Sequence, residues 1–348
     1  MKIIVPSHDL DMVMRKTFGR LSERPEFKIY IAGPDEEKRP QEGACIGIDS
    51  PKIKSKFTRP AIKDLRRKMK ELDIDIAFSA STSGLSNALM ASIGLKVKNV
   101  GYRGTQAKVR RTDPTFYLGL LNPRVRHIVC ETTDIHENLK RYINPNKLSG
   151  MPKPYDLEWV ANAIKNPKTN EAIKESNLRC IYIGITEGRP HKGLNYLLDA
   201  MRQLVNEGVT LTVIGRAGEE DMASAPANVS FFGSRPDAID FLPTHDLFIL
   251  PSLRDASPRV VREAQACGVP CIVTDIPGAR DLIISNGKMC GGVTVSPGDA
   301  DGLAEKIREL IGDKEQLAKM GQDGKRNIKE NYALGPYVDY YANLFKSL

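Results

Sequence analysis

The sequence lacks any long apolar run, and this absence excludes the simplest integral membrane proteins. No stretch of the 348 residues approaches the roughly 20 apolar residues that cross a bilayer. The first run, Ile3-Ile4-Val5, is closed by Pro6 and is too short for the core of a signal peptide. We therefore expect a cytoplasmic protein, either free or peripheral on the cytosolic face of a membrane.

Cysteine pairs and metal-ligand spacings are also lacking. The six cysteines are scattered without a C-x-x-C pair, and no His stands at ligand spacing beside Cys267 and Cys271. Free cysteines are among the most often buried residues, so reduced, buried thiols are expected. Asp73 and Asp75 form an Asp-x-Asp pair, but they flank the start of an apolar run and are interpreted as structural. The sequence therefore predicts no metal site.

Acidic residues are scarce in one half of the chain only. Residues 1–150 hold 28 Lys and Arg against 17 Asp and Glu, whereas the remainder holds 23 against 26. The excess lies in residues 51–126, with 17 basic against 5 acidic side chains. Such a division indicates that the two halves meet different partners, although a solvated Lys-rich surface is the alternative. Residues 61–72 combine basic side chains with an apolar stripe, which either enters the core or lies on an anionic bilayer.

Short apolar runs recur, and each is followed by a segment with apolar residues at helical spacing. The runs do not alternate with polar residues, which suits strands buried on both faces of a parallel sheet. Strand and helix in alternation predict right-handed parallel βαβ units. The runs are residues 3–5, 29–33, 74–78, 99–102 and 128–130 in the first half, and 181–184, 211–215, 229–233, 247–250 and 271–273 in the second.

The strands fall into two groups, and a chain of this length usually forms two domains. We predict an N-terminal Rossmann-like domain at 1–150, a Pro-containing linker at 151–178 and a C-terminal Rossmann-like domain at 179–330. A last helix at 331–348 is expected to pack back on the N-terminal domain. The fold class is therefore α/β, with two doubly wound domains facing each other across a cleft. Ligands of open α/β sheets bind at the carboxyl ends of the strands, which would line this cleft.

The loop after the run at 247–250 is the richest in candidate residues. It carries Asp255, and Ser257 then has the pattern of an N-cap with Pro258 at the first helical position. Such a helix start offers backbone N–H groups and the positive end of a helix dipole to a phosphate or a hydroxyl. Glu263, more than one turn into the helix, can accept two hydrogen bonds from a vicinal diol such as a ribose.

This segment resembles the signature of the GT-B glycosyltransferases of family 4, PSxxEGxPxxxxEA continuing into AxGxPVV. Asp255 and Glu263 stand at the spacing of its two acids. Residues 274–283 and 295–304 are similar to two further family motifs, TDxGGxxELI and VPPGDxxxLA. The resemblance covers about residues 180–311 with several motifs in order. The other positions in register are Pro251, Ser252, Pro258, Ala264, Gly268 and Pro270.

The resemblance implies a retaining transferase whose co-substrate is a nucleotide sugar, UDP- or GDP-linked, with no further cofactor. Glu263 is similar to the acid that holds the ribose hydroxyls. Asp255, with the backbone N–H groups of Ala256 and Ser257, would address the hydroxyls of the donor sugar. Asp replaces the family's Glu here and Ala its Gly, so the identity of the donor sugar stays open. Taken alone, the two acids would be a surface loop acid and a solvated helix Glu.

A second constellation resembles the family's GRLxxxKG, in which a strand-end Gly leads to an Arg and a Lys that clamp the donor diphosphate. Gly184 and Lys192 match that pattern. The Arg directly after the Gly is missing, because Ile185 stands there, and the loop is two residues longer. Arg189 would supply the guanidinium, which can fork across two phosphate oxygens, with a solvated basic turn as the equal alternative.

Two more turns complete the expected donor site. Gly215-Arg216 and Gly233-Ser234-Arg235 end strands whose turns line the base and ribose in the family, and simple strand-to-helix turns are the alternative. The full set of donor-binding candidates is Gly184, Lys192, Gly215, Arg216, Ser234, Arg235, Asp255, Ala256, Ser257, Pro258 and Glu263.

The acceptor side falls in the first half. Arg103 and Gly104 stand where family members usually carry a strand-end His-Gly. An Arg stays protonated and cannot act as a base, but it could stabilise negative charge on a phosphate or an acidic acceptor. His8 and Asp9, after the first strand, are the other candidates, although a lone His at a strand end is more often structural.

Retaining transferases of this family are thought to react on one face of the sugar, and the leaving phosphate oxygen takes the acceptor's proton. The protein then positions groups and neutralises charge, a task we assign to Lys192, Arg189 and Asp255. We predict a hexosyltransferase acting on a glycan, lipid-linked or lipopolysaccharide-type acceptor, anionic in character, with peripheral contact to an anionic membrane and no nucleic-acid partner. Two alternatives stay open: a degenerate GT-B protein that binds glycan or nucleotide sugar without transfer, and a nucleotide-sugar epimerase on the same fold.

Overall fold

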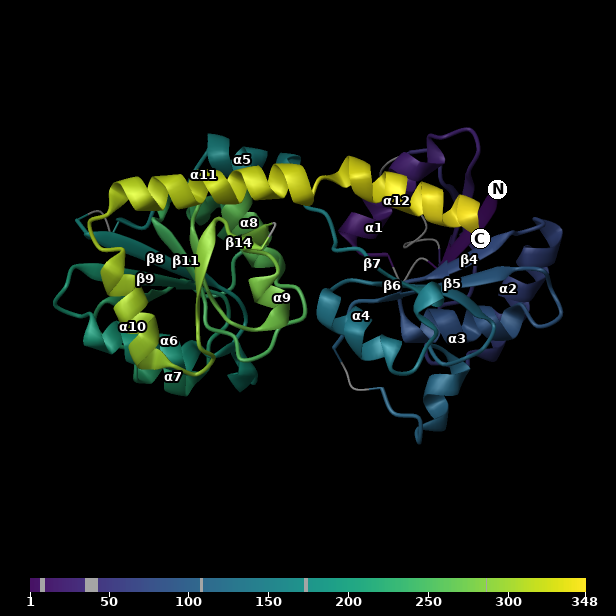
Figure 1. The fold of residues 1–348 in the computed structure, drawn as a ribbon, viewed down its shortest axis with the longest axis horizontal. Helices are drawn as coiled ribbons and strands as arrows, with labels where there is room; N and C mark the ends of the chain where they lie inside the picture. The colour runs from purple at the N-terminus through teal and green to yellow at the C-terminus, as the bar shows by residue number, and fades with distance from the viewer. Residues whose placement is uncertain (7–9, 35–42, 107–108, 172–174, 286) are drawn as a thin grey trace. The chain divides into compact units, whose positions relative to one another are not determined.

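The computed structural model describes residues 1–6, 10–34, 43–106, 109–171, 175–285 and 287–348. The chain divides into two compact units (Figure 1). The first unit comprises Met1–Pro154 together with Leu334–Leu348, and the second comprises Tyr155–Ala333. Each unit contains one large parallel sheet with helices packed on both faces. The predicted fold class, α/β with two Rossmann-like doubly wound domains, is confirmed.

The first unit is built on a seven-stranded sheet whose neighbouring strands all run parallel. Its strands are β1 (Lys2–Pro6), β2 (Lys28–Gly33), β3 (Ile46–Asp49), β4 (Ile76–Ser79), β5 (Lys98–Arg103), β6 (Val125–Cys130) and β7 (Leu148–Gly150). Their spatial order is β3-β2-β1-β4-β5-β6-β7, so the order reverses between β1 and β4. This reversal is the topological switch point, where doubly wound sheets bind ligands at the carboxyl ends of the strands.

Five helices and two 3-10 turns cover this sheet in the described residues. They are α1 (Met12–Ser22), α2 (Arg59–Glu71), α3 (Thr82–Ala91), η3 (Pro114–Leu118), α4 (Thr133–Lys140), η4 (Pro145–Lys147) and α12 (Leu334–Ser347). Helix α2 buries Ala61, Leu65 and Met69 against the sheet. Of the two arrangements considered for residues 61–72, the one with the apolar stripe in the core is therefore the one found.

Aromatic rings join the C-terminal helix to the first unit. Helix α12 packs on α1, and Phe345 is fully buried with its ring centroid 6.4 Å from that of Phe18 and 6.2 Å from that of Phe78. Phe18 and Phe78 themselves lie 5.0 Å apart, edge to face. Aromatic pairs in this geometry add stability beyond the area that they bury. The last fifteen residues are therefore part of the first unit's core.

The second unit has a six-stranded parallel sheet and one small hairpin. The sheet strands are β8 (Leu178–Ile183), β9 (Val209–Ile214), β10 (Val229–Phe231), β11 (Leu247–Leu250), β12 (Cys271–Thr274) and β15 (Gly292–Val295), and the hairpin strands are β13 (Ile284–Ser285) and β14 (Lys288–Met289). The spatial order β10-β9-β8-β11-β12-β15 places the switch point between β8 and β11. The loops after these two strands are therefore the expected ligand loops.

Helices lie on both faces of the second sheet (Figure 1). They are α5 (Ala161–Lys165), α6 (Leu194–Gln203), α7 (Glu219–Ala223), α8 (Arg259–Ala266), α9 (Pro277–Arg280), α10 (Ala300–Glu309) and α11 (Lys314–Asn331), with the 3-10 turns η5 (Leu157–Val160), η7 (Pro190–Lys192) and η8 (Ala238–Thr244). Helices α6 and α10 share one core cluster with the sheet, and α8 with the end of α11 shares the other. No helix among the described residues is long and apolar enough to cross a bilayer.

Residues 151–178 do not form the linker that the sequence suggested. From Tyr155 onward the chain belongs to the second unit, where η5 and α5 form. Tyr155 and Val160 are buried in its core, and the Tyr155 amide donates to the Tyr332 carbonyl at 2.8 Å. The linker prediction rested on the absence of a strand-like run, and it overlooked that Leu157, Val160 and Ala163 can anchor short helical turns.

Candidate active site

Two loops at the switch point of the second sheet bring Lys192 and Asp255 into contact. One loop follows β8 and the other follows β11, and these strands are neighbours. Lys192 Nζ lies 2.6 Å from Asp255 Oδ2, and the two side chains are only 22% and 17% exposed. A charged hydrogen bond of this length is about twice as strong as a neutral one. Two of the three candidate catalytic residues thus form one ion pair.

The backbone holds these two loops together without help from the charges. The Leu253 amide donates to the His191 carbonyl at 2.8 Å. Gly193 adopts φ +71°, and a Cβ at this position would lie 2.0 Å from the carbonyl oxygen of Pro251. A glycine is required there both by the left-handed conformation and by the close approach of the second loop. The glycine of the Lys192-Gly193 motif is therefore required by the structure.

A third loop, after β12, supports the Asp255 loop from the other side. The Thr274 hydroxyl donates to the Ser252 carbonyl. A Cβ on Gly278, at the start of α9, would lie 2.1 Å from the Ala256 carbonyl oxygen and 2.4 Å from that of Asp255. The motif residues at 274–283 thus help to fix the position of the Asp255 loop through contacts with its backbone. The sequence alone did not indicate this role.

Glycine turns continue the same edge of the sheet beyond β8. The Gly215 amide donates to the Gly233 carbonyl at 2.8 Å, and a Cβ on Gly215 would lie 1.8 Å from the Gly184 carbonyl oxygen. The Arg216 carbonyl accepts a hydrogen bond from the Thr186 amide at 2.9 Å. The structure therefore brings Gly184, Gly215 and Arg216 together in one row of close backbone contacts next to Lys192's loop.

The start of α8 differs in detail from the prediction. Pro258 is the residue before the helix instead of its first residue, and the Ser257 side chain does not cap the helix. Its Oγ instead accepts a hydrogen bond from an Arg262 Nη at 3.1 Å. The N-cap prediction for Ser257 is therefore wrong, because a long donor one turn into the helix holds its hydroxyl. In the described residues, the amides of Ala256 and Ser257 have no protein acceptor.

Glu263 is a buried carboxylate that forms an ion pair with Arg259. Its side chain is 9% exposed, and Oε1 lies 2.7 Å from Nε of Arg259, which is half exposed. Burial raises the pKa of Glu263, and the charges of Arg259 and Arg262 offset part of that rise. A buried acid of this kind is costly to the fold unless it is paired and hydrogen-bonded. Arg259 supplies such a pair, so the buried carboxylate of Glu263 is kept where it can accept hydrogen bonds from a ligand.

Three other candidates take different positions. Arg189 is exposed, and its carbonyl accepts from the Lys192 amide at 2.9 Å, so it lies on the same tight turn. Ser234 is exposed beyond β10. The Arg235 guanidinium donates to both carboxylate oxygens of Asp237, at 2.9 and 2.8 Å, and lies over the Phe241 ring. The guanidinium of Arg235 is thus used within its own turn, as in the alternative interpretation of this segment as a simple strand-to-helix turn.

The first unit carries its own polar cluster at the carboxyl ends of β5 and β6. Arg103 ends β5 and is buried, which lowers the pKa of its guanidinium. A Cβ on Gly104 would lie 2.4 Å from Oε2 of Glu131, which follows β6 directly. His8 and Asp9, the other acceptor-side candidates, lie outside the described residues.

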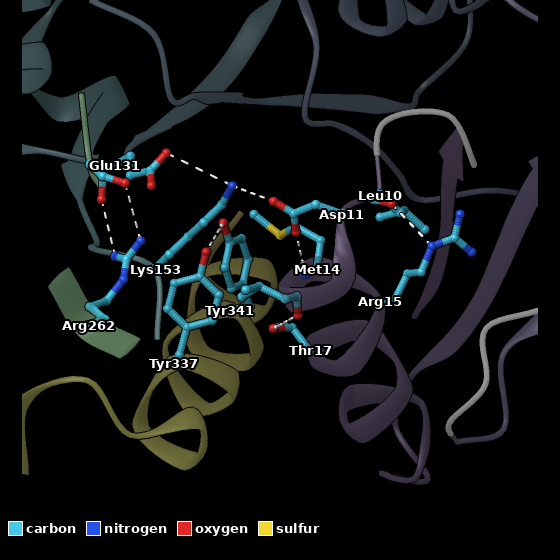
Figure 2. Close-up of polar contacts among 12 residues, drawn as sticks. Leu10, Asp11, Met14, Arg15, Thr17, Glu131, Lys153, Arg262, Tyr337 and Tyr341 are labelled. Carbon is cyan, nitrogen blue, oxygen red and sulfur yellow. Dashed lines mark hydrogen bonds and ion pairs between the residues drawn. The ribbon is translucent and has the colours of Figure 1, made fainter. Parts of the chain in front are cut away.

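Sequence reasoning missed the charged pairs of this cluster. Lys153 lies between two acids, with Nζ 2.5 Å from Asp11 Oδ2 and 3.9 Å from Glu131 Oε2 (Figure 2). It also lies 5.1 Å from the centroid of the buried Tyr102 ring. The sequence could have indicated Glu131, because an acid directly after an apolar run is expected at the carboxyl end of a strand. Lys153 carried no such signal. In the described residues, no group of three His, Cys, Asp or Glu side chains could hold a metal ion.

Comparison with known proteins agrees with this architecture. The model of the family described as "Glycosyl transferases group 1" matches residues 165–327. The structure of HepE from Anabaena in complex with UDP is similar over the whole of both chains, with a TM-score of 0.77 at 14% sequence identity. The likeness to this solved structure concerns the fold, which is that of the GT-B glycosyltransferases.

Curated relatives match over longer stretches of sequence. The chain is 30% identical over 275 residues to N-acetyl-alpha-D-glucosaminyl L-malate synthase of Bacillus anthracis, which covers 73% of this chain and 68% of the relative. It is 27% identical over 219 residues to UDP-Gal:alpha-D-GlcNAc-diphosphoundecaprenol alpha-1,3-galactosyltransferase of Escherichia coli, covering 59% and 55%. The chain spans about two fifths to two thirds of the length of several curated relatives. On these matches and motifs, the chain belongs to the glycosyl transferases group 1 family.

Proposed function

We propose that this protein is a retaining glycosyltransferase that transfers a sugar from a UDP- or GDP-linked donor. The observation that carries this proposal is the cation–acid pair of Lys192 and Asp255 at the switch point of the second sheet. Glu263 on the helix after the Asp255 loop adds a buried acceptor of hydrogen bonds. A nucleotide sugar consists of a sugar, a diphosphate and a ribose, and these three parts need a hydroxyl acceptor, a cation and a second acceptor, the roles proposed for Asp255, Lys192 and Glu263.

In this proposal Lys192 exchanges its carboxylate partner for the donor diphosphate. The ammonium is fixed 2.6 Å from Asp255 Oδ2, and a diphosphate, with one negative charge on each phosphate, competes well for such a cation. Arg189 on the same turn reaches the second phosphate. The amides of Ala256 and Ser257 and the start of α8 add donors of hydrogen bonds for the oxygen atoms of the donor. Asp255, once released, accepts hydrogen bonds from hydroxyl groups of the sugar.

The nucleoside part lies along the glycine turns and α8. Glu263 accepts hydrogen bonds from the ribose hydroxyls, and its burial strengthens them because little water competes. Gly184 and Gly215 pack closely on each other, so the turns beside the nucleoside part present backbone without side chains at these two positions. Arg216 and Ser234 lie at the ends of the neighbouring turns, beside the base.

The reaction breaks the bond between the anomeric carbon and the diphosphate oxygen while the acceptor oxygen bonds to the same face of that carbon. The acceptor's proton passes to the leaving phosphate oxygen, so the products are the glycoside and a nucleoside diphosphate. The protein's task is to hold the two substrates and to stabilise the negative charge that develops on the leaving group. Lys192, Arg189 and the amides near α8 do this, so the chemistry runs without a metal cofactor.

The acceptor is a glycan, a lipid-linked sugar or a lipopolysaccharide-type molecule that carries negative charge. Arg103 and Lys153 are the cations of the first unit's cluster, and Gly104 allows the Glu131 carboxylate to approach the end of β5 closely. The name of the Escherichia coli relative includes a diphosphoundecaprenol acceptor. The charge of residues 51–126, with 17 basic against 5 acidic side chains, supports an anionic acceptor for this chain as well.

Product analysis tests the proposal. The protein is incubated with UDP- and GDP-linked hexoses and a membrane-lipid extract or a phosphorylated glycan. Release of nucleoside diphosphate and an unchanged anomeric configuration of the transferred sugar, measured by NMR, are expected. An inverted product would refute the retaining mechanism. Donor binding without turnover on any acceptor would favour the degenerate binding protein.

A further inference from the structure

Two loops at the carboxyl edge of the first sheet form a joined surface outside the cluster around Arg103. Residues 50–58 follow β3, and η3 lies in the loop after β5. Lys56 Nζ donates to Thr115 Oγ1 at 2.7 Å and lies 5.6 Å from the Phe116 ring centroid. The Thr58 amide donates to Asn87 Oδ1 at 2.9 Å, which ties the first loop to α3. The two loops are therefore held in place together.

This surface exposes large apolar side chains. Phe57 is 53% exposed, Tyr117 45% and Leu118 39%. Single exposed apolar residues are normal on soluble proteins. Here three of them lie within a few residues of the Lys56–Thr115 contact, at the tips of two anchored loops. Such a group of apolar side chains indicates an interaction site.

Cations surround the apolar side chains, and acids are few. Residues 51–59 contain four Lys and Arg and no acid. Arg59 lies over the Phe57 ring, 5.8 Å from its centroid. The acid at the start of η3, Asp113, accepts hydrogen bonds from Thr115, and these bonds, with the charges of Lys56 and Arg110, lower its pKa. We call the set Lys52, Lys54, Lys56, Phe57, Arg59, Tyr117 and Leu118 the basic-aromatic patch.

The cations of helix α2 that follow Arg59 differ from those of the patch. Arg67 is paired with Asp64 and Glu71, and Lys68 is paired with Asp64. Arg66 donates to the carbonyl groups of Ala91 and Ile93. Much of the helix's positive charge is thus used within the protein. Among the described residues, Lys54 in the loop before the helix and Arg59 at its first position form no ion pair, so their charge can attract a partner.

We propose that the basic-aromatic patch binds the surface of an anionic lipid bilayer. Phe57, Tyr117 and Leu118 enter the boundary between headgroups and acyl chains, as apolar side chains of peripheral proteins do. Lys54 and Arg59 remain at the level of the lipid phosphates and bury their alkyl stems beside the aromatic rings. A soluble acidic partner would explain the cations but not the exposed rings. The inference deepens the proposed function, because a lipid-linked acceptor lies at such a surface.

Cosedimentation with vesicles tests the patch. The full chain is mixed with vesicles of phosphatidylcholine alone or with one third phosphatidylglycerol, at low and high salt. Each Lys or Arg near an anionic surface strengthens binding about fivefold. The Lys54→Glu/Arg59→Glu variant, which removes two such cations, is therefore expected to lose at least about 25-fold in binding to the anionic vesicles. Phe57→Ser/Tyr117→Ser should weaken binding that persists at high salt.

The matched controls lie at the opposite edge of the same sheet. Lys70 and Lys98 are exposed at the end of α2 and the start of β5, so Lys70→Glu/Lys98→Glu makes the same change in net charge. Ile93 is 57% exposed beyond α3, so Ile93→Ser is the control for an apolar side chain. Both controls should bind within about twofold of the unchanged protein, because screened charges this far from the surface contribute little.

Several results would overturn the proposal. Equal binding to neutral and anionic vesicles, no binding to either, or an equal loss in the control variants would each do so. Displacement by soluble polyglutamate, with Phe57→Ser/Tyr117→Ser unchanged, would indicate an acidic macromolecule instead of a membrane. Donor binding is measured on the same variants by thermal shift. A protein that binds vesicles but no nucleotide sugar would keep the patch and refute the proposed function; the reverse would refute the patch alone.

Discussion

Gly278 offers the sharpest test of how the candidate active site is held. A Cβ at this position would lie 2.1 Å from the Ala256 carbonyl oxygen, whereas ordinary contacts begin at 3.4 Å. The Gly278→Ala variant must therefore separate α9 from the Asp255 loop by about 1 Å, because neither contact partner is a flexible side chain. Overpacking of this kind costs about 1–3 kcal/mol of unfolding free energy. It also moves Asp255 relative to Lys192, and a 1 Å misplacement can reduce turnover about 100-fold.

The assay combines urea denaturation, followed by circular dichroism, with titration of the nucleotide-sugar donor by calorimetry. Gly218→Ala is the control in the same unit, because its Cβ would meet nothing nearer than Asp221 Oδ2 at 3.7 Å. We expect Gly278→Ala to lower both stability and donor affinity, and Gly218→Ala to leave donor affinity unchanged. A Gly278→Ala protein as stable and as tight in donor binding as the unchanged chain would refute the reasoning.

Three further predictions concern acid–base behaviour, the aromatic core and metal dependence. Burial raises the pKa of Glu263, so its charge destabilises the fold as pH rises through that pKa. Glu263→Gln should therefore be at least as stable as the unchanged protein at pH 7, although it binds the donor worse. Below the ordinary glutamate pKa of about 4.3, the stability difference between the two proteins should vanish in urea titrations. A Glu263→Gln variant that is clearly less stable at pH 7 would contradict this. Phe345→Ala should cost about 3–5 kcal/mol in the unfolding of the first unit, since the ring is fully buried against Phe18 and Phe78, and a loss confined to the second unit's transition would be the contrary result. Transfer activity should survive EDTA, because Lys192 and Arg189 neutralise the diphosphate; activity lost on chelation and restored by Mn²⁺ or Mg²⁺ would count against that role.

The parallel sheets were predictable because each buried strand left an unalternated apolar run in the sequence. The runs at 211–215 and 271–273, for example, correspond to β9 and β12. Strands with exposed or mixed faces left no such run. Strand β3 is largely exposed, and β7 has only three residues, so neither was expected. The apolar criterion detects burial, and it cannot detect edge strands that are held mainly by backbone hydrogen bonds.

The candidate site was predictable where spacing encodes geometry. Lys192 and Asp255 are 63 positions apart and still meet, because their loops follow neighbouring strands at the switch point. The sequence could not reveal that the two are paired with each other, nor that Arg262 would hold Ser257. Such contacts depend on side-chain rotamers after folding. The role of Gly278 was hidden for a similar reason, since it depends on the approach of a loop far away in the sequence.

Binding of nucleotide sugars to single-site variants tests the central claim most directly. Melting temperature and affinity are measured with UDP-, GDP- and ADP-linked sugars for the unchanged protein, Lys192→Ala and Glu263→Ala. The control is Lys306→Ala, because the Lys306 side chain is paired with Glu309 away from the site. A donor that binds only the folded chain raises its stability. We predict that one UDP- or GDP-linked sugar binds, and that Lys192→Ala and Glu263→Ala each lose about 30-fold in affinity, from about 2 kcal/mol for a charged hydrogen bond. Unchanged binding by both variants, or no binding of any nucleotide sugar to the unchanged protein, would contradict the account.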